Sequence, residues 1–179
     1  MKTRTVSALL TVAAFSACSM GPMMTPRVDN ASLPEAVRVP AGHTMRMATT
    51  GVGEITYECR EKSAAAGQYE WAFVGPVAML HAADKRNVGK YYAGPTWEAS
   101  DGSKVTGKQV AIAPAMPGSI PLQLVKTEPA MGAGSMTGVT YIQRLNTKGG
   151  VAPATTCEAA NKGQRRQVAY EADYVFYGS

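Results

Sequence analysis

The sequence predicts a single all-β domain, an antiparallel sandwich or barrel with at most a short helix. Three observations carry this prediction. Short apolar stretches alternate with polar residues at a period of two, apolar residues at helical spacing are scarce, and Gly, Pro and Asp-Gly turns separate the stretches. Many short strands in one domain of about 140 residues favour a closed or two-layered antiparallel sheet.

The clearest strand covers residues 166–177, where mostly apolar even-numbered positions alternate with Gln167, Glu171 and Asp173. The even-numbered set is Val168, Tyr170, Ala172, Tyr174 and Phe176. Further strands are expected over residues 44–49, 54–60, 69–74, 122–127 and 138–144. Only residues 154–162 suggest a turn or two of helix.

A β-hairpin is predicted between Trp97 and Thr106, around the dipeptide Asp101-Gly102. Asp-Gly accepts the positive φ angles of a two-residue primed turn. In that register Ser100 faces Ser103 and Trp97 faces Thr106.

The N-terminus predicts export. Lys2 and Arg4 precede an apolar run of about ten residues, too short to be a membrane-spanning helix. Small residues then lead to Cys18, and the whole segment resembles a bacterial lipoprotein signal. We therefore divide the chain into a signal peptide (1–17), a lipidated Cys18 with a flexible, Pro-rich tether (18–40) and the β-rich domain (41–179). Cleavage near Ser16 or Ala17 without lipidation, giving a secreted protein, and an uncleaved anchor remain alternatives.

These features predict a place in the bacterial cell envelope, with the membrane as partner through the lipid on Cys18. Ser19 is not the Asp that favours inner-membrane retention, so an outer-membrane lipoprotein facing the periplasm is expected, with secretion as the alternative. The net charge is +5, and loss of Lys2 and Arg4 with the signal leaves +3. So mild a charge, with scattered basic residues, argues against nucleic acid as a partner. The sequence does not indicate an oligomeric state.

Two cysteines remain besides Cys18. Cys59 ends an expected strand, and Cys157 lies in the loop before the last strand. A pair of cysteines in an oxidising compartment most often forms a disulfide. Neither has a CxxC neighbour, and no His lies near Cys157, so a metal site or a catalytic thiol is disfavoured.

Polar residues cluster where the strand over 138–144 ends. Tyr141 and Gln143 should point to one face of the strand, and Ile142 and Arg144 to the other. Arg144 is expected to pair with an acid such as Glu98 and so to join two hairpins.

A ligand-binding groove is the alternative for the same region. It would be lined by Trp97, Glu98, Gln143, Arg144 and Asn146. A Trp face stacks on a sugar ring, amides bind hydroxyl groups, and a guanidinium binds a carboxylate in two places, so a glycan or a carboxylated ligand would suit it.

No catalytic signature stands out, and the leading interpretation is a non-enzymatic binding or structural module whose partner is a glycan or an envelope protein. The alternative is an enzyme, a glycan-directed hydrolase that uses Glu98 or Asp101 in acid–base catalysis. These two carboxylates flank a tight turn, where such groups are usually solvated. The glycine-rich run 132–138 resembles a dinucleotide-binding loop, but Thr137 replaces its third glycine and no helical pattern follows, so a flexible loop is expected.

The leading expectation is that the protein has no cofactor. A third hypothesis is a periplasmic Cu(I) site. The spacing of His43, Met45 and Met47 puts three ligands on one face of a strand, and Met79 and His81 repeat the pairing elsewhere. Thioether and imidazole ligands favour Cu(I). Methionine in the packed core is the alternative explanation.

Several sequence blocks together resemble a known family. They are residues 94–98 (GPTWE), 101–105 (DGSKV) and 141–150 (YIQRLNTKGG), followed by Pro153, Cys157 and the pattern Tyr170-x-x-x-Tyr174-x-Phe176-Tyr177. They resemble the secreted bacterial and fungal family catalogued as domain of unknown function 3455, from about Pro40 to Tyr177. The resemblance implies an exported domain. This chain has Ile55, Lys90 and Leu122 where Gln, His and Trp are frequent in the family.

Overall fold

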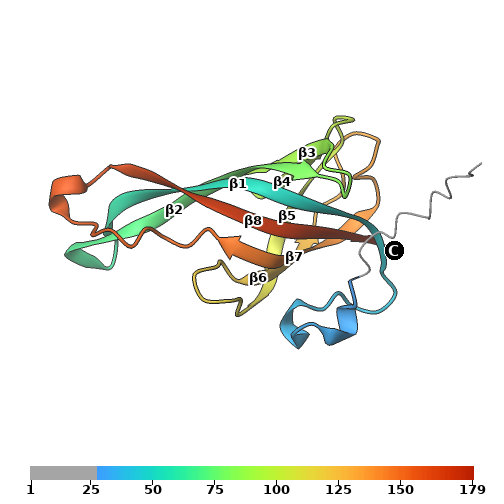
Figure 1. Ribbon diagram of the computed structural model, residues 1–179, viewed down its shortest axis with the longest axis horizontal. Coiled ribbons are helices and arrows are strands. Elements are labelled where there is room, and N and C mark those ends of the chain that lie inside the picture. The colour runs from blue at the N-terminus through green and yellow to red at the C-terminus, as the bar shows by residue number, and fades with distance from the viewer. Residues whose placement is uncertain (1–27) are drawn as a thin grey trace, which may run out of the picture.

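Eight antiparallel strands close into a barrel in this computed structural model, which describes residues 28–179 (Figure 1). The strands follow one another around the barrel in chain order, and β8 pairs with β1 to close it. They are β1 (Thr44–Lys62), β2 (Ala65–His81), β3 (Asn87–Tyr92), β4 (Thr96–Ala99), β5 (Lys104–Ala113), β6 (Leu122–Thr127), β7 (Val139–Gly149) and β8 (Arg165–Gly178). The helical structure of the described residues consists of three 3-10 turns, η1 (Asn30–Ser32), η2 (Glu35–Val37) and η3 (Ala159–Asn161). The predicted all-β class is confirmed.

Three strands are longer than the barrel needs. β1, β2 and β8 contain 19, 17 and 14 residues, against 4 in β4 and 6 in β6. Their outer ends leave the barrel as an arm, which we define as these strand ends together with residues 151–164 (Figure 1). The predicted disulfide between Cys59 and Cys157 is confirmed and ties the segment before η3 to β1 within this arm.

The barrel interior is filled by the side chains that alternate inward along each strand. On β8 the inward residues are Tyr170, Ala172, Tyr174 and Phe176, as the sequence alternation predicts. Trp97 from β4 is also part of this core and is only 1% exposed. Side chains therefore fill the middle of the barrel.

A second hydrophobic cluster covers the outside of the barrel wall. The N-terminal segment, which we define as residues 28–40, lays Val37 and Val39 against outward side chains such as Leu124, Leu145 and Val175. The described part of the expected tether therefore packs on the barrel. The expected signal peptide, Cys18 and the rest of the tether lie outside the described residues.

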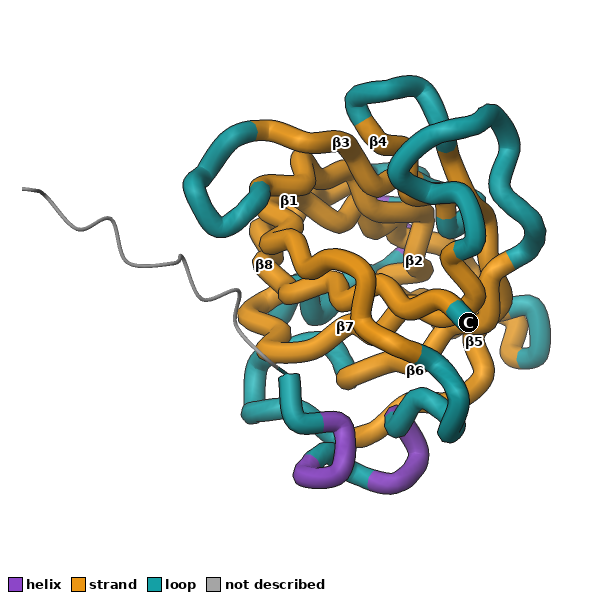
Figure 2. The backbone as a smooth tube through the Cα atoms, turned by 90° about the vertical axis from the view of Figure 1, so that its right-hand side faces the viewer, coloured by secondary structure: helices purple, strands orange, loops and turns teal. Residues whose placement is uncertain are grey.

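Loops gather at the end of the barrel away from the arm, which we call the closed end (Figure 2). The β4–β5 hairpin lies here, but the predicted register is wrong by one residue, because Trp97 faces Val105 and Thr96 faces Thr106. Gly102 alone in this turn has a positive φ, of 87°, and its amide donates to the Ala99 carbonyl at 3.0 Å. The turn is therefore a three-residue loop that ends in a glycine, and a two-residue primed turn does not form.

The helical turns within residues 28–179 are all too short to cross a lipid bilayer.

Candidate ligand-binding site at the barrel mouth

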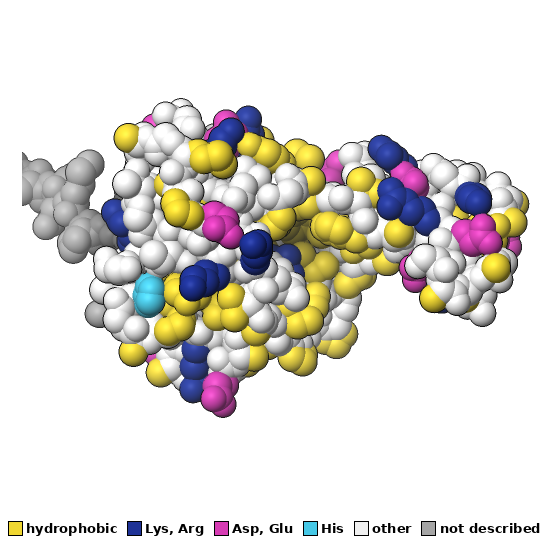
Figure 3. Space-filling view, turned by 180° about the vertical axis from the view of Figure 1, so that it is seen from behind, with side chains coloured by type: hydrophobic (Ala, Val, Ile, Leu, Met, Phe, Trp, Pro, Cys, Tyr) yellow, Lys and Arg dark blue, Asp and Glu magenta, His cyan; other side chains and the backbone are white. Residues whose placement is uncertain are grey.

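The end of the barrel that faces the arm is open. A cavity of about 320 Å³ lies there, within the size range of small-molecule sites. We call it the mouth. It is lined by Ile55, Tyr57, Phe73, Val74, Pro76, Tyr91, Ala93, Gly94, Pro95, Gln109, Ile120, Pro121, Gln123 and Arg144. Hydrophobic side chains also gather in the hollow between the barrel and the arm (Figure 3).

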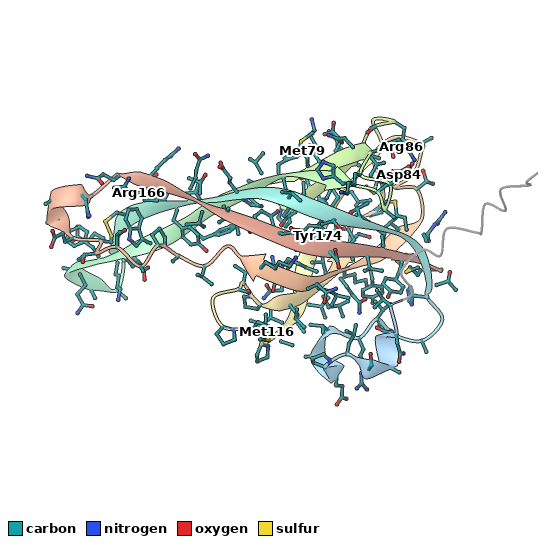
Figure 4. The ribbon with its side chains drawn as sticks, in the orientation of Figure 1. Met79, Asp84, Arg86, Met116, Arg166 and Tyr174 are labelled. Carbon is teal, nitrogen blue, oxygen red and sulfur yellow. A yellow bond between two sulfur atoms is a disulfide. The ribbon has the colours of Figure 1, made fainter. Side chains whose placement is uncertain are left out.

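Aromatic rings form much of the wall of the mouth. Tyr57 and Phe73 face each other across β1 and β2, with their rings edge to face at 6.0 Å. Tyr91 stacks on the buried Trp97 at 4.7 Å and packs against Tyr174 at 5.1 Å. Figure 4 labels Tyr174 on β8 in the middle of the barrel. Most of this wall is fixed by the core behind it, whereas Phe73 is 58% exposed and free to contact a ligand.

Arg144 is the one charged residue among the described residues that line the mouth. It pairs with Tyr174 across β7 and β8, and it follows the buried Ile142 by two residues, so it points toward the interior as the alternation predicts. Its Nε and Nη2 donate to the Pro121 carbonyl at 3.2 and 2.9 Å. The guanidinium is therefore held in one orientation by the backbone.

The positive charge of Arg144 affects the pKa of the surrounding tyrosine hydroxyl groups. Burial raises the pKa of Tyr57 and of Tyr91, and the nearby guanidinium partly opposes that rise in both cases. The Tyr57 hydroxyl donates to the Gly150 carbonyl at 2.8 Å, so this phenol is neutral and already bonded. At neutral pH the mouth thus carries a single positive charge among uncharged side chains.

Two amides complete the rim. Gln123 on β6 donates from its Nε2 to the Oε1 of Gln109 on β5 at 2.7 Å. The amide NH₂ of Gln109 is left available to a ligand.

The residues predicted for a ligand groove do not come together. Trp97 lies in the core, and Gln143 is fully buried on the outer face of the barrel, where it donates to Asn30 Oδ1 and to the Val37 carbonyl. Asn146 adopts a positive φ of 48° and donates to Asp173 on the outer face. Of the predicted set only Arg144 lines the mouth.

Glu98 does not pair with Arg144, so the expected link between the two hairpins is wrong. Glu98 instead forms an ion pair with Lys90 at 3.2 Å and accepts a 2.7 Å hydrogen bond from the Tyr92 hydroxyl. These contacts hold its pKa below the usual range, the Tyr92 hydrogen bond having the larger effect.

Asp101 lies at the closed end of the barrel. Its carboxylate accepts hydrogen bonds from the hydroxyl and amide of Ser103 and of Ser135, which strongly lower its pKa. A general acid needs a raised pKa, and neither Asp101 nor Glu98 has one.

The five residues of the copper hypothesis are divided among different surroundings. A β-bulge between Met45 and Met47 puts Met45 in the outer cluster and Met47 against the interior core, so the predicted shared face does not form. His43 packs edge to face on Tyr141 at 4.8 Å. Met79 pairs with Val52, and His81 with Thr50, both across β1 and β2. In the part of the chain that the structure describes, no group of three or more His, Cys, Asp or Glu side chains is arranged to hold a metal ion.

The residues of the mouth that sequence reasoning missed are mainly aromatic residues and amides, namely Tyr57, Phe73, Tyr91, Gln109 and Gln123. Alternation within each strand indicates their inward direction, but strands far apart in the chain contribute them. Only the closed barrel brings them together.

Comparison with known proteins identifies the family of the chain. No curated protein and no solved structure matches the chain. The family model described as "Protein of unknown function (DUF3455)" matches residues 40–178, which covers the whole barrel and the arm. The chain therefore belongs to the DUF3455 family, as the sequence blocks predict.

Proposed function

We propose that this protein is a non-enzymatic binding module of the bacterial cell envelope, lipid-anchored through Cys18, that takes up a small molecule in the barrel mouth. The observation that carries the proposal is the mouth itself, an apolar cavity of about 320 Å³ with aromatic walls and one oriented cation. Binding sites of this type combine a largely apolar lining with a few fixed polar groups.

The rigidity of the mouth supports a binding role. Tyr91 is stacked on Trp97, Tyr57 is bonded to Gly150, and Arg144 is bonded to Pro121. A site whose walls are already ordered loses little conformational entropy when a ligand enters.

An enzymatic role has weaker support. Glu98 and Asp101, the carboxylates of the hydrolase hypothesis, are both bonded so that the ionised form is favoured, and neither lines the mouth. The mouth contains no acid, His or Cys among its described lining residues.

The position of the N-terminal segment supports the anchoring part of the proposal. Val28 packs against the outer cluster and lines a small pocket with Ala48 and Val175, near the start of β1 and therefore away from the arm (Figure 1). An anchor at Cys18, ten residues earlier in the chain, would leave the mouth and the arm directed away from the membrane.

Binding in the mouth is tested with N-phenyl-1-naphthylamine, a neutral apolar dye that fluoresces when it leaves water. We expect the mature protein to bind it and Ala93→Phe to weaken binding at least tenfold, because Ala93 is an exposed residue of the mouth whose enlargement fills the cavity. Ala66→Phe, at an exposed position on the arm, is the matched control. No binding by the mature protein, or equal binding by both variants, would overturn the proposal.

The anchor is tested separately by intact-mass spectrometry of the protein purified from its own envelope fraction. A diacylglycerol or triacyl increment on a chain that begins at Cys18 supports the proposal. An unmodified chain that begins elsewhere would contradict the lipid anchor and leave secretion as the better account.

A further inference from the structure

We infer that the mouth binds an amphipathic monocarboxylate, with its carboxylate on the free edge of the Arg144 guanidinium and its apolar part against Tyr57, Phe73 and Ile120. This inference rests on the proposed function and adds the chemical class of the ligand to it.

The hydrogen bonds of Arg144 leave one edge of its guanidinium open. The Pro121 carbonyl occupies the edge formed by Nε and Nη2. Among residues 28–179, Nη1 has no hydrogen-bond partner, so the edge formed by Nη1 and Nη2 is available. That edge presents two parallel N–H groups, the arrangement that binds a carboxylate in two places.

No acid among residues 28–179 is paired with this edge. The ion pairs among the described residues leave Arg144 out, and Glu98, its predicted partner, is bonded to Lys90 and Tyr92. The neighbouring strand β8 carries two acids. Asp173 accepts hydrogen bonds from Thr50 and Asn146, Glu171 forms an ion pair with Lys148 at 2.7 Å, and neither acid lines the mouth. A cation held in an apolar cavity without a counterion is a specific site for a ligand anion.

The rest of the lining determines the chemical character of the part of the ligand that does not contact Arg144. Ile55, Tyr57 and Ile120 are buried, with exposed fractions of 8% or less, and with Phe73 they form a continuous apolar wall beside Arg144. The cavity has one charged lining residue, so a single anionic group on an otherwise apolar molecule satisfies it. A sugar would leave most of its hydroxyls facing this wall without partners, and burial of such groups is costly.

Two probes of nearly the same shape test the charge requirement. Calorimetric titration of the mature protein at pH 7 compares 2-naphthoate with 2-naphthamide, its neutral isostere. We expect naphthoate to bind at least tenfold more tightly, as is typical of hydrogen bonds to a charged group. Equal affinities for the two probes would overturn the inference.

Variants then test whether Arg144 is the residue that gives the preference for naphthoate. Arg144→Gln should remove the preference for naphthoate. Arg144→Lys should keep part of it, because a lysine retains the charge but lacks the two parallel N–H groups that bind both carboxylate oxygens. Arg86→Gln is the matched control, since Arg86 is an exposed cation far from the mouth at the closed end of the barrel (Figure 4). A preference that survives Arg144→Gln would contradict the inference, and the comparison on the unmodified protein decides the question if that variant fails to fold.

The dye separates this inference from the proposed function. If N-phenyl-1-naphthylamine binds while naphthoate has no advantage over naphthamide, the mouth is a binding site and its assignment to a carboxylate is wrong. If neither the dye nor naphthoate binds, both proposals fail.

Discussion

Asp101 holds Ser135 across the closed end of the barrel. Its Oδ2 accepts hydrogen bonds from the Ser135 amide at 2.7 Å and from the Ser135 hydroxyl at 2.6 Å. The other oxygen, Oδ1, binds the amide and hydroxyl of Ser103 in the same way. One carboxylate thus pins the loop that precedes β7 onto the β4–β5 hairpin, and the next residue, Met136, is pushed into the core with 1% exposure.

We expect Asp101→Ala to lower the melting temperature by about 5 °C at pH 7, because four hydrogen bonds to a carboxylate are lost at once. Asp84→Ala is the control, since Asp84 is an exposed acid that binds only its neighbour Arg86. Equal melting temperatures for the two variants, measured by circular dichroism, would show that the carboxylate does not hold the loop.

The stabilisation by Asp101 should also depend on pH. The hydrogen bonds from Ser103 and Ser135 lower the pKa of the folded carboxyl below its ordinary value of 3.8. A group with a depressed folded pKa stabilises the protein above its unfolded pKa and loses that effect as the pH falls through the folded pKa. The difference in melting temperature between the wild type and Asp101→Ala should therefore be constant from pH 5 to 7 and shrink below pH 3.8; a difference that grew there would contradict this assignment.

Met136→Ala tests how much the packing of Met136 into the core stabilises the barrel. Removing a fully buried methionine side chain should lower the free energy of unfolding by about 2–4 kcal/mol, since a cavity remains where the side chain was. Met116→Ala should leave stability nearly unchanged, because Met116 is 76% exposed on the β5–β6 loop (Figure 4). Urea titration of both variants measures the difference, and a loss below about 1 kcal/mol for Met136→Ala would argue against tight packing of Met136 in the core.

Much of the fold follows from local alternation. The period of two along residues 166–177 correctly predicted the inward side of β8, and the same rule placed Ile142 and Arg144 on one face of β7 and Gln143 on the other. The strand expected over residues 122–127 matches β6 (Leu122–Thr127). Alternation succeeds here because burial on one face of a strand leaves a direct trace in the sequence.

The errors arise where an added residue or a distant partner decides the structure. A bulge after Met45 reverses the face of Met47, and a three-residue loop shifts the register of Trp97 by one. β3 (Asn87–Tyr92) was not expected, because its first four residues contain only one apolar side chain, Val88. The mouth could not be foreseen either, since its lining comes from six strands that meet only when β8 closes on β1.

Gln143 fastens the N-terminal segment to the barrel. Its Nε2 donates to the Val37 carbonyl at 2.6 Å and to Asn30 Oδ1 at 2.9 Å, and its side chain is fully buried. We expect Gln143→Ala to cost about 1–3 kcal/mol of this attachment, because the buried Val37 carbonyl and the half-buried Asn30 Oδ1 each lose a donor. The segment should open more often as a result.

The rate of tryptic cleavage after Arg38, the basic residue of the N-terminal segment, measures how often the segment opens. The rate of cleavage after Arg38 should rise at least fivefold in Gln143→Ala. Gln167→Ala, at an exposed position on β8, should be cleaved like the wild type. Equal rates in the three proteins would mean that Val37 and Val39 hold the segment without help from Gln143.

The disulfide in the arm should be the largest single contribution to stability. It joins residues separated by 98 positions, and closing so long a loop in the unfolded chain contributes about 4–5 kcal/mol. Beside it, Trp71 donates from its indole nitrogen to the Thr155 carbonyl at 2.7 Å. The disulfide therefore also keeps the segment that contains Thr155 on β2.

We expect a Cys59→Ala, Cys157→Ala double variant to lose about 2–5 kcal/mol of unfolding free energy and to shift its tryptophan emission to longer wavelength at room temperature. The shift should come from Trp71 as residues 151–157 loosen, so Trp71→Phe in the same background should abolish it, whereas the buried Trp97 keeps its emission. Reductant should reproduce both effects in the wild type and change nothing in the double variant. If the double variant is less stable but keeps its emission spectrum, the disulfide stabilises the protein only by restricting the unfolded chain. Hydrogen bonds such as that from Trp71 would then be enough to hold the folded arm in place.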